Sequence, residues 1–252
     1  MTDSLVDLLA ARSGIVCAVG AGGKKTTLYR LAREHPGRVG VTSTVLIPPF
    51  PRGMADREII ADESALPGAL RTASRARVVA FAHPSTRRAR LAGLRPELVG
   101  RAHRMGGFDL TVVKADGARS RWIKAPAADE PVLPPDASTV LPIVSARALG
   151  SPLSDAVAHR LELVERLTGA RRGEPLAAEH LARLLAHPDG ALKAVGKAVV
   201  IPIINMVDDP ELEAGAVAAA RAALAATRRF DLIVLAAMRR RDPIVRVIER
   251  GP

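Results

Sequence analysis

Short apolar runs alternate with stretches of helical periodicity along most of the chain. Each apolar run has the length of one buried strand, and the runs lie at 14–19, 38–43, 76–81, 108–113, 139–144, 198–204, 231–236 and 244–248. Between them, spacings of three and four between apolar residues predict helices at 4–11, 28–33, 63–74, 96–105, 153–168, 175–186 and 211–228. Strands that alternate with helices favour parallel pairing, because each return crossing is a helix. The pattern therefore predicts an α/β protein with a doubly wound, mostly parallel sheet.

Composition supports one sizeable core. The chain has 252 residues, of which 48% are hydrophobic but only 2% aromatic, so Ala, Val, Leu and Ile must fill the core. We expect a single domain over 1–252 with a small helical insertion at 151–190. The lone Cys17 cannot form an internal disulfide, which favours the cytoplasm. The first residues carry acid where a secretion signal needs basic residues, and no apolar run approaches the roughly 18 residues of a membrane span.

The net charge of +11 is spread over many short arginine clusters. Such a balance favours anionic partners in general, either a nucleotide or an acidic protein surface. Proteins that bind single-stranded nucleic acid need aromatic side chains on which bases stack, and this chain has one Trp, one Tyr and four Phe. A role in binding nucleic acid is therefore disfavoured.

A glycine-rich run between the first predicted strand and its helix is typical of a phosphate-binding loop. Its residues are Gly20, Ala21, Gly22, Gly23, Lys24, Lys25, Thr26 and Thr27. The backbone N–H groups and the helix dipole can bind phosphate, a lysine adds a point charge, and a threonine hydroxyl can hold Mg²⁺. The usual spacing G-x-x-x-x-G-K-[ST] is matched only in part, so two registers remain open. Either Lys24 is the phosphate lysine and Thr26 supplies the hydroxyl, which we favour, or Lys25-Thr26 is the K-T pair.

An acidic residue follows the fourth apolar run, at Asp116-Gly117. In phosphate-loop NTPases an acid at this place holds Mg²⁺ through water, and the N–H of the next glycine lies near the terminal phosphate. Arg119 follows closely and is a candidate for contact with the developing negative charge. The catalytic candidates are Lys24, Asp116 and Arg119. The metal candidates are Thr26, Thr44 and Asp116, although an ordinary turn at Asp116 and an ordinary strand end at Thr44 are alternatives.

A candidate base-binding element follows the sixth apolar run, as Asn205-Met206-Val207-Asp208. It is similar to the N-K-x-D element, in which the carboxylate accepts two hydrogen bonds from guanine and so rejects adenine. Met206 replaces the usual lysine, whose stem packs on the base; a thioether can pack in the same way but has no charge. Asn205 and Asp208 therefore favour GTP, with ATP as the alternative.

Several segments together resemble one family. They are Gly20–Leu28, Val41–Thr44, Ala115–Arg119, Trp122–Pro131, His159-Arg160 and Ile204–Asp208. They are similar to the selenium-dependent molybdenum hydroxylase accessory proteins of the YqeC type, and the run around Lys124-Ala125-Pro126 is the most specific part. The resemblance implies a P-loop NTPase-like three-layer sandwich and a role in maturing or loading molybdenum-cofactor hydroxylases. Lys114, Asp129 and Met206 depart from the residues common in that family.

The leading hypothesis is an accessory NTPase that binds GTP (or ATP) with Mg²⁺ and acts as a switch through slow hydrolysis. The loop at 118–135 would change state and time a handover to a partner, either a molybdenum hydroxylase or a cofactor-maturation protein. An alternative is a small-molecule kinase that uses ATP, in which Lys124 and the basic residues around Arg119 bind the acceptor. The third class is a basic nucleic-acid-binding protein.

Overall fold

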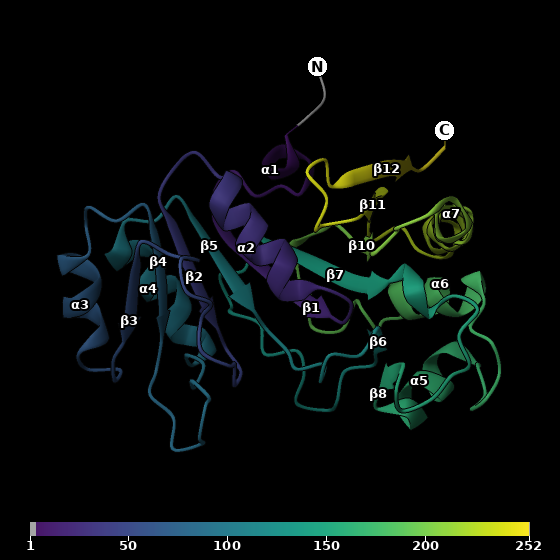
Figure 1. Ribbon diagram of the computed structural model, residues 1–252, viewed down its shortest axis with the longest axis horizontal. Coiled ribbons are helices and arrows are strands. Elements are labelled where there is room, and N and C mark those ends of the chain that lie inside the picture. Colours follow the sequence, from purple (N-terminus) through teal and green to yellow (C-terminus); the bar gives the residue numbers. More distant parts are fainter. Residues whose placement is uncertain (1–3, 252) are drawn as a thin grey trace. The chain divides into compact units, whose positions relative to one another are not determined.

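The computed structural model describes residues 4–251 and has two compact units (Figure 1). Of the described residues, the first unit comprises 4–18, 27–116 and 132–140, and the second comprises 19–26, 117–131 and 141–251. Each unit carries parallel strands with helices packed on them. The predicted α/β class with a mostly parallel sheet is confirmed, and it is consistent with a P-loop NTPase-like sandwich.

The first unit contains a fully parallel sheet in the order β1-β5-β2-β4-β3. Its strands are β1 (Gly14–Gly20, the last two residues of which belong to the second unit), β2 (Val39–Ser43), β3 (Arg57–Ile60), β4 (Val78–Ala82) and β5 (Leu110–Lys114). Its helices are α1 (Leu5–Leu8), α2 (Lys24–Glu34, from Thr27 on), α3 (Leu66–Thr72) and α4 (Pro96–Gly106). Strands β2 and β4 are buried throughout, as near-continuous apolar runs in a covered parallel sheet should be.

The register of this sheet brings several carboxyl ends to one edge. Ala18 of β1 and Ser43 of β2 both pair with Lys114 of β5. Just beyond them, the Ala115 N–H donates to the Ala18 carbonyl at 3.1 Å and the Thr44 N–H to the Lys114 carbonyl at 3.1 Å. Asp116 and Thr44 therefore follow neighbouring strands at the edge where parallel sheets place their ligands.

The second unit pairs β7 (Thr139–Ser145, from Leu141 on), β10 (Ile203–Asn205) and β11 (Leu232–Ala236) in parallel, and β12 (Ile244–Glu249) runs antiparallel to β11. A two-stranded parallel sheet joins β6 (Ile123–Lys124) to β8 (Ala158–His159). The remaining elements are η1 (Ala146–Ala148), α5 (Leu161–Thr168), α6 (Ala178–Ala186), β9 (Val199–Val200) and α7 (Pro210–Ala226). Helix α6 packs against both α5 and α7.

The structure corrects the sequence-based boundaries at three places. The helix predicted over 153–168 begins only at Leu161, because residues 158–159 pair with β6 and Arg160 adopts a left-handed conformation with φ of 63°. The strand predicted over 198–204 divides into β9 and β10 around Pro202, which cannot donate a hydrogen bond to a sheet. Strand β3 was not predicted, since its residues are mostly exposed and two of them are charged.

Two further expectations concern the domain organisation and membrane-spanning helices. Helices α5 and α6 lie within the region expected to be a helical insertion, while the single-domain organisation over 1–252 stays a prediction. Among the described residues, no helix combines the length and the apolar character needed to cross a bilayer.

Candidate functional site

The glycine-rich loop lies between β1 and α2 and is packed too closely to carry side chains. Gly20, Gly22 and Gly23 all have positive φ, at 88°, 85° and 120°. A Cβ atom on Gly20 would lie 2.3 Å from the Ile143 carbonyl oxygen, and one on Gly22 would lie 2.6 Å from the Ser145 nitrogen. The Ala21 N–H donates to the same Ile143 oxygen at 2.8 Å. The loop therefore lies directly against the end of β7, with backbone in contact with backbone.

The two adjacent lysines of the loop differ in their surroundings. Lys24, the first residue of α2, is 5% exposed and its Nζ donates to the Gly20 carbonyl. Lys25 is exposed, Thr26 is half-buried and Thr27 is buried. Only the ammonium group of Lys24 is thus held over the loop, at the positive end of the helix dipole.

Asn205, at the end of β10, ties the loop to two other segments. Its side chain is buried, and its Nδ2 donates to the Gly22 carbonyl at 2.7 Å. Its Oδ1 accepts from the Met238 N–H, just after β11, at 3.1 Å. A Cβ on Gly23 would lie 2.2 Å from Asn205 Nδ2. The structure thus gives Asn205 backbone partners in the loop and after β11, which makes it a positioning residue for the loop.

Asp208 is held by two arginines that sequence reasoning missed. Arg147, within η1 after β7, donates from Nε at 3.0 Å and from Nη2 at 2.6 Å, and both bonds reach Oδ2 of Asp208. Arg240 donates to the backbone carbonyl of Asp208. The Asp208 side chain remains 37% exposed. The position of Arg147 just after a buried strand was the only signal in the sequence that could have marked it.

Met206 stands between these two polar residues in a left-handed conformation, with φ of 61°. Its Sδ accepts a hydrogen bond from the Ser145 hydroxyl at 3.1 Å. Because Ser145 also touches Gly22, the thioether connects the end of β10 with the end of β7. Met206 stands at the lysine position of the N-K-x-D element, and it makes this contact with its thioether.

Segment 117–131 is anchored by a cluster of charges with little exposure. Lys124 is 3% exposed; its Nζ donates to the Gly117 carbonyl at 2.7 Å and pairs with Glu130. The Glu130 Oε2 also accepts from Arg160 Nη1 at 2.6 Å. Lys124 pairs with His159 in the β6–β8 register. This pairing brings His159, the last residue of β8, and Arg160, which follows it, to the cluster. Glu130 is the shared anion of two cations.

The charges of this cluster shift two pKa values. Burial alone would raise the pKa of Glu130, but hydrogen bonds and charges from Arg160 and Lys124 outweigh it and lower the pKa to about 2. Burial, followed by the charges of Arg160, Lys124 and Arg119, lowers the pKa of His159 to about 4. At neutral pH Glu130 is therefore ionised and His159 is uncharged.

Arg119 lies on a strained turn. Arg119 and Ser120 both have positive φ, at 46° and 61°, and both side chains are exposed. Two consecutive left-handed residues without glycine cost of the order of 1–3 kcal/mol each. These strained residues begin two positions after Gly117, and the Gly117 carbonyl accepts a hydrogen bond from Lys124.

The other predicted site residues lie in the first unit. Asp116 is buried, at 1% exposure. The Thr44 hydroxyl donates to the Val132 carbonyl at 2.6 Å, and the Thr42 hydroxyl donates to the Phe81 carbonyl at 2.7 Å. Thr26 belongs to the second unit, so shared Mg²⁺ binding by Thr26, Thr44 and Asp116 stays a prediction.

Comparison with known proteins places the chain in a family. The sequence model of the YqeC protein family matches residues 16–162, which is more than half of the chain. The chain belongs to the YqeC family. Over 196 residues it is 28% identical to the uncharacterized protein YqeC of Escherichia coli (strain K12), a match that covers 76% of this chain and 75% of that protein. No solved structure is significantly similar.

The YqeC match covers most of the candidate site. It contains the glycine-rich loop, Asp116 and the cluster of Lys124, Glu130 and Arg160, and it ends before Asn205 and Asp208. Family membership supports an accessory-protein role.

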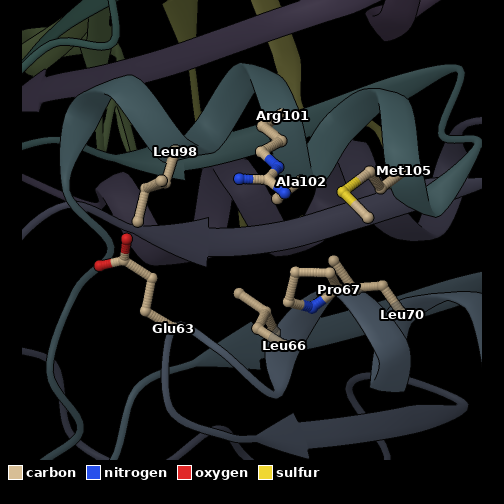
Figure 2. A pocket seen from close by; sticks show the side chains of 8 residues that line it. All are labelled: Glu63, Leu66, Pro67, Leu70, Leu98, Arg101, Ala102 and Met105. Atoms are coloured by element: carbon tan, nitrogen blue, oxygen red, sulfur yellow. The ribbon is translucent and has the colours of Figure 1, made fainter.

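A cleft elsewhere on the first unit is too small for a nucleotide. It lies between α3 and α4, where mainly apolar side chains face each other (Figure 2). The residues that line it are Glu63, Leu66, Pro67, Leu70, Leu98, Arg101, Ala102 and Met105. Its volume of about 30 Å³ leaves room for about one water molecule.

We expect Asn205→Ala to destabilise the protein strongly. The substitution leaves the Gly22 carbonyl and the Met238 N–H without their partner in a buried place, which costs about 2–4 kcal/mol. Urea unfolding measures this loss. Asp208→Ala is the control, since it breaks only an exposed ion pair and should cost less than about 1 kcal/mol. Equal, small losses in the two variants would contradict the positioning role of Asn205.

We expect Glu130→Gln to lose stability in a pH-dependent way. The folded-state pKa of about 2 lies below the ordinary 4.5, so the ionised Glu130 adds stability above pH 4.5 that disappears as the pH falls towards 2. The variant should be about 1–3 kcal/mol less stable than the wild type at pH 7, and the gap should close between pH 4.5 and 2. Denaturant unfolding across this range checks it.

The control for Glu130 is Glu213→Gln, which breaks a surface pair with Arg246 and should cost less than about 1 kcal/mol at any of these pH values. A gap for Glu130→Gln that stays constant with pH would show that its carboxylate is not stabilised by the two cations.

Proposed function

We propose that this protein binds a nucleoside triphosphate with Mg²⁺ at the glycine-rich loop and serves as an accessory protein for molybdenum-cofactor hydroxylases. The proposal rests mainly on one observation, a loop with three glycines at positive φ and the buried Lys24 ammonium folded over it. The second part of the proposal also draws on the family resemblance, which implies that role.

The loop suits an anion for two reasons. Gly20, Gly22 and Gly23 let the loop fold tightly against β7 and Asn205, and the backbone N–H groups of such a loop before a helix can bind phosphate oxygens. Lys24 lies at the N-terminus of α2, where the helix dipole favours anions, so both the lysine charge and the dipole attract a phosphate group. Both features support phosphate as the ligand.

We propose that the residues predicted from the sequence bind Mg²⁺ and a triphosphate. Lys24 and the loop amides would hold the phosphates, and Thr26, Thr44 and Asp116 supply the oxygen atoms that Mg²⁺ prefers. When bound, Mg²⁺ neutralises charge that develops on the phosphate oxygens. Arg119 is the residue that could add positive charge near the reacting group, and we expect hydrolysis by the protein alone to be slow.

For base recognition, we assign the main role to Asp208 and not to Asn205. The amide of Asn205 contacts Gly22 and Met238, and thus holds the loop. Asp208 is half-exposed, and its Oδ1 takes part in neither of the Arg147 bonds. A carboxylate in this state can accept from guanine, which carries adjacent donors at N1 and the exocyclic amine. We therefore propose GTP as the preferred nucleotide and Asp208 as the residue that selects it.

A change in nucleotide state would reach segment 118–131 through Gly117. Lys124 holds the Gly117 carbonyl and at the same time the Glu130 carboxylate, so a movement of Gly117 changes the charge cluster. The strained turn at Arg119 and Ser120 lies between these points. We propose that the nucleotide state changes segment 118–131 through this connection.

A small-molecule kinase is the competing function. In that function Lys124 would bind the molecule that accepts the phosphate. In the structure, however, the ammonium of Lys124 contacts Gly117 and Glu130 within the protein. The two functions differ in their products: with nucleotide labelled on the terminal phosphate, release of free phosphate supports the switch, and a phosphorylated metabolite supports the kinase.

We expect Lys24→Ala to weaken nucleotide binding at least about tenfold, because it removes the cation held over the loop. Lys25→Ala removes the same charge from an exposed position and should weaken binding less than about threefold. Isothermal titration with Mg²⁺-GTP compares the two variants, and circular dichroism confirms that both are folded. The reverse order would overturn the assignment of Lys24.

We expect Asp208→Asn to shift preference from GTP towards XTP. Arg147 can only donate, so it orients the new side chain with its oxygen towards the guanidinium and its amide towards the base. That amide suits xanthine, which has a carbonyl where guanine has its amine, whereas with guanine it would face a second donor. Competition of GTP, XTP and ATP for both proteins checks this. If all three nucleotides weaken equally, Asp208 does not read the base.

A further inference from the structure

A basic loop at the end of β4 is held in place by backbone pairing. The loop, residues 84–90, lies between His83 and Ala92, which exchange hydrogen bonds of 3.0 and 2.9 Å. Next to this pair, Ile47 and Leu91 exchange bonds of 3.0 and 2.8 Å. Four backbone hydrogen bonds thus fix the base of the loop, and its tip projects as part of the folded first unit.

The tip of this loop carries uncompensated positive charge. Arg87, Arg88 and Arg90 are exposed, and no acidic residue occurs between Pro84 and Pro96. Within residues 4–251, none of these three guanidinium groups forms an ion pair. Three like charges within four positions repel one another, and an anionic partner would offset that repulsion.

The neighbours of the loop favour a protein partner over a nucleic acid. Leu46, next to Ile47 at the base of the loop, is 39% exposed, so the base of the loop carries an exposed apolar side chain. Arginine with apolar residues is typical of protein interfaces. Phe81 and Phe50, the aromatic residues nearest in sequence to the base of the loop, are 0% and 7% exposed and offer no surface on which a base could stack.

The base of the loop is packed against the end of β2. The Leu94 N–H donates to the Ser43 carbonyl at 2.8 Å, and a Cβ on Gly93 would lie 2.3 Å from the Thr44 carbonyl carbon. A partner on the loop would therefore lie at the same edge of the first unit as Thr44.

We propose that the loop of residues 84–90, together with Leu46, is a docking surface for an acidic, leucine-containing segment of a partner protein. This surface is separate from nucleotide binding, because it uses none of the residues assigned to the glycine-rich loop. Guanidinium groups pair with carboxylates in a planar, two-bond geometry, and Leu46 adds apolar contact.

The test uses a fluorescein-labelled peptide of about 20 residues rich in Glu and Leu, because an interface of standard size involves about 20–30 residues per partner. Binding is measured by fluorescence anisotropy at about 150 mM salt, where distant charges are screened. A Glu/Ser peptide of the same charge and a single-stranded RNA serve as comparison probes. The test variant is the triple substitution Arg87→Gln, Arg88→Gln and Arg90→Gln.

The matched control is the triple substitution Arg171→Gln, Arg221→Gln and Arg228→Gln, which removes the same charge from dispersed, exposed positions. We expect the loop variant to bind the Glu/Leu peptide about tenfold more weakly and the control variant to stay within about twofold. Leu46→Ser should weaken binding of the Glu/Leu peptide and leave the Glu/Ser peptide unchanged.

Two outcomes would overturn the proposal. Equal weakening in the loop variant and the control variant would show that only net charge matters. Tighter binding of the RNA than of the Glu/Leu peptide, lost in the loop variant, would make the loop a nucleic-acid surface. Because GTP binding uses other residues, it should be the same in the loop variant and the wild type.

Discussion

The hydrogen bond between the Asn205 amide and the Gly22 carbonyl holds the candidate site together. A loop without side chains cannot fix its own conformation, so its order must come from backbone contacts with neighbouring segments. The end of β7 provides one such contact through Ile143, and the end of β10 provides the other through Asn205. With Met238 as its second partner, one buried amide joins the loop, β10 and the segment after β11. Lys24 directly follows Gly23 in this loop, and its Nζ donates to the Gly20 carbonyl.

The second constraint is electrostatic. Lys124 and Arg160 share Glu130, and Lys124 also reaches back to Gly117. A buried ion group of this kind contributes little net stability, since desolvation offsets much of the attraction, but removal of one member leaves the others uncompensated. Such a cluster therefore suits segment 117–131, which we propose to change between two conformations. The strained Arg119 and Ser120 lie within the part of the chain that this cluster anchors.

The sequence predicted the fold class because the apolar runs and helical spacings are strong and regular. Strand β3 was missed, because an exposed edge strand lacks an apolar run, and the start of α5 was misplaced, because the pairing of β8 with β6 depends on residues distant in sequence. The glycine-rich loop was recognised from local spacing alone. The roles of Asn205 and Arg147 were not, since each depends on a contact with a residue distant in sequence, Gly22 for Asn205 and Asp208 for Arg147. Local patterns reveal which residues are available, and tertiary contacts decide what they touch.

The central claim is that the glycine-rich loop binds a nucleoside triphosphate. The most direct measurement is the thermal stability of the wild-type protein with GTP, ATP or CTP, each with and without Mg²⁺. A ligand at about 100 times its dissociation constant adds about 2.7 kcal/mol to the stability. We expect stabilisation of this size that depends on Mg²⁺ and is largest for GTP. An unchanged unfolding temperature with all three nucleotides at millimolar concentration would contradict it.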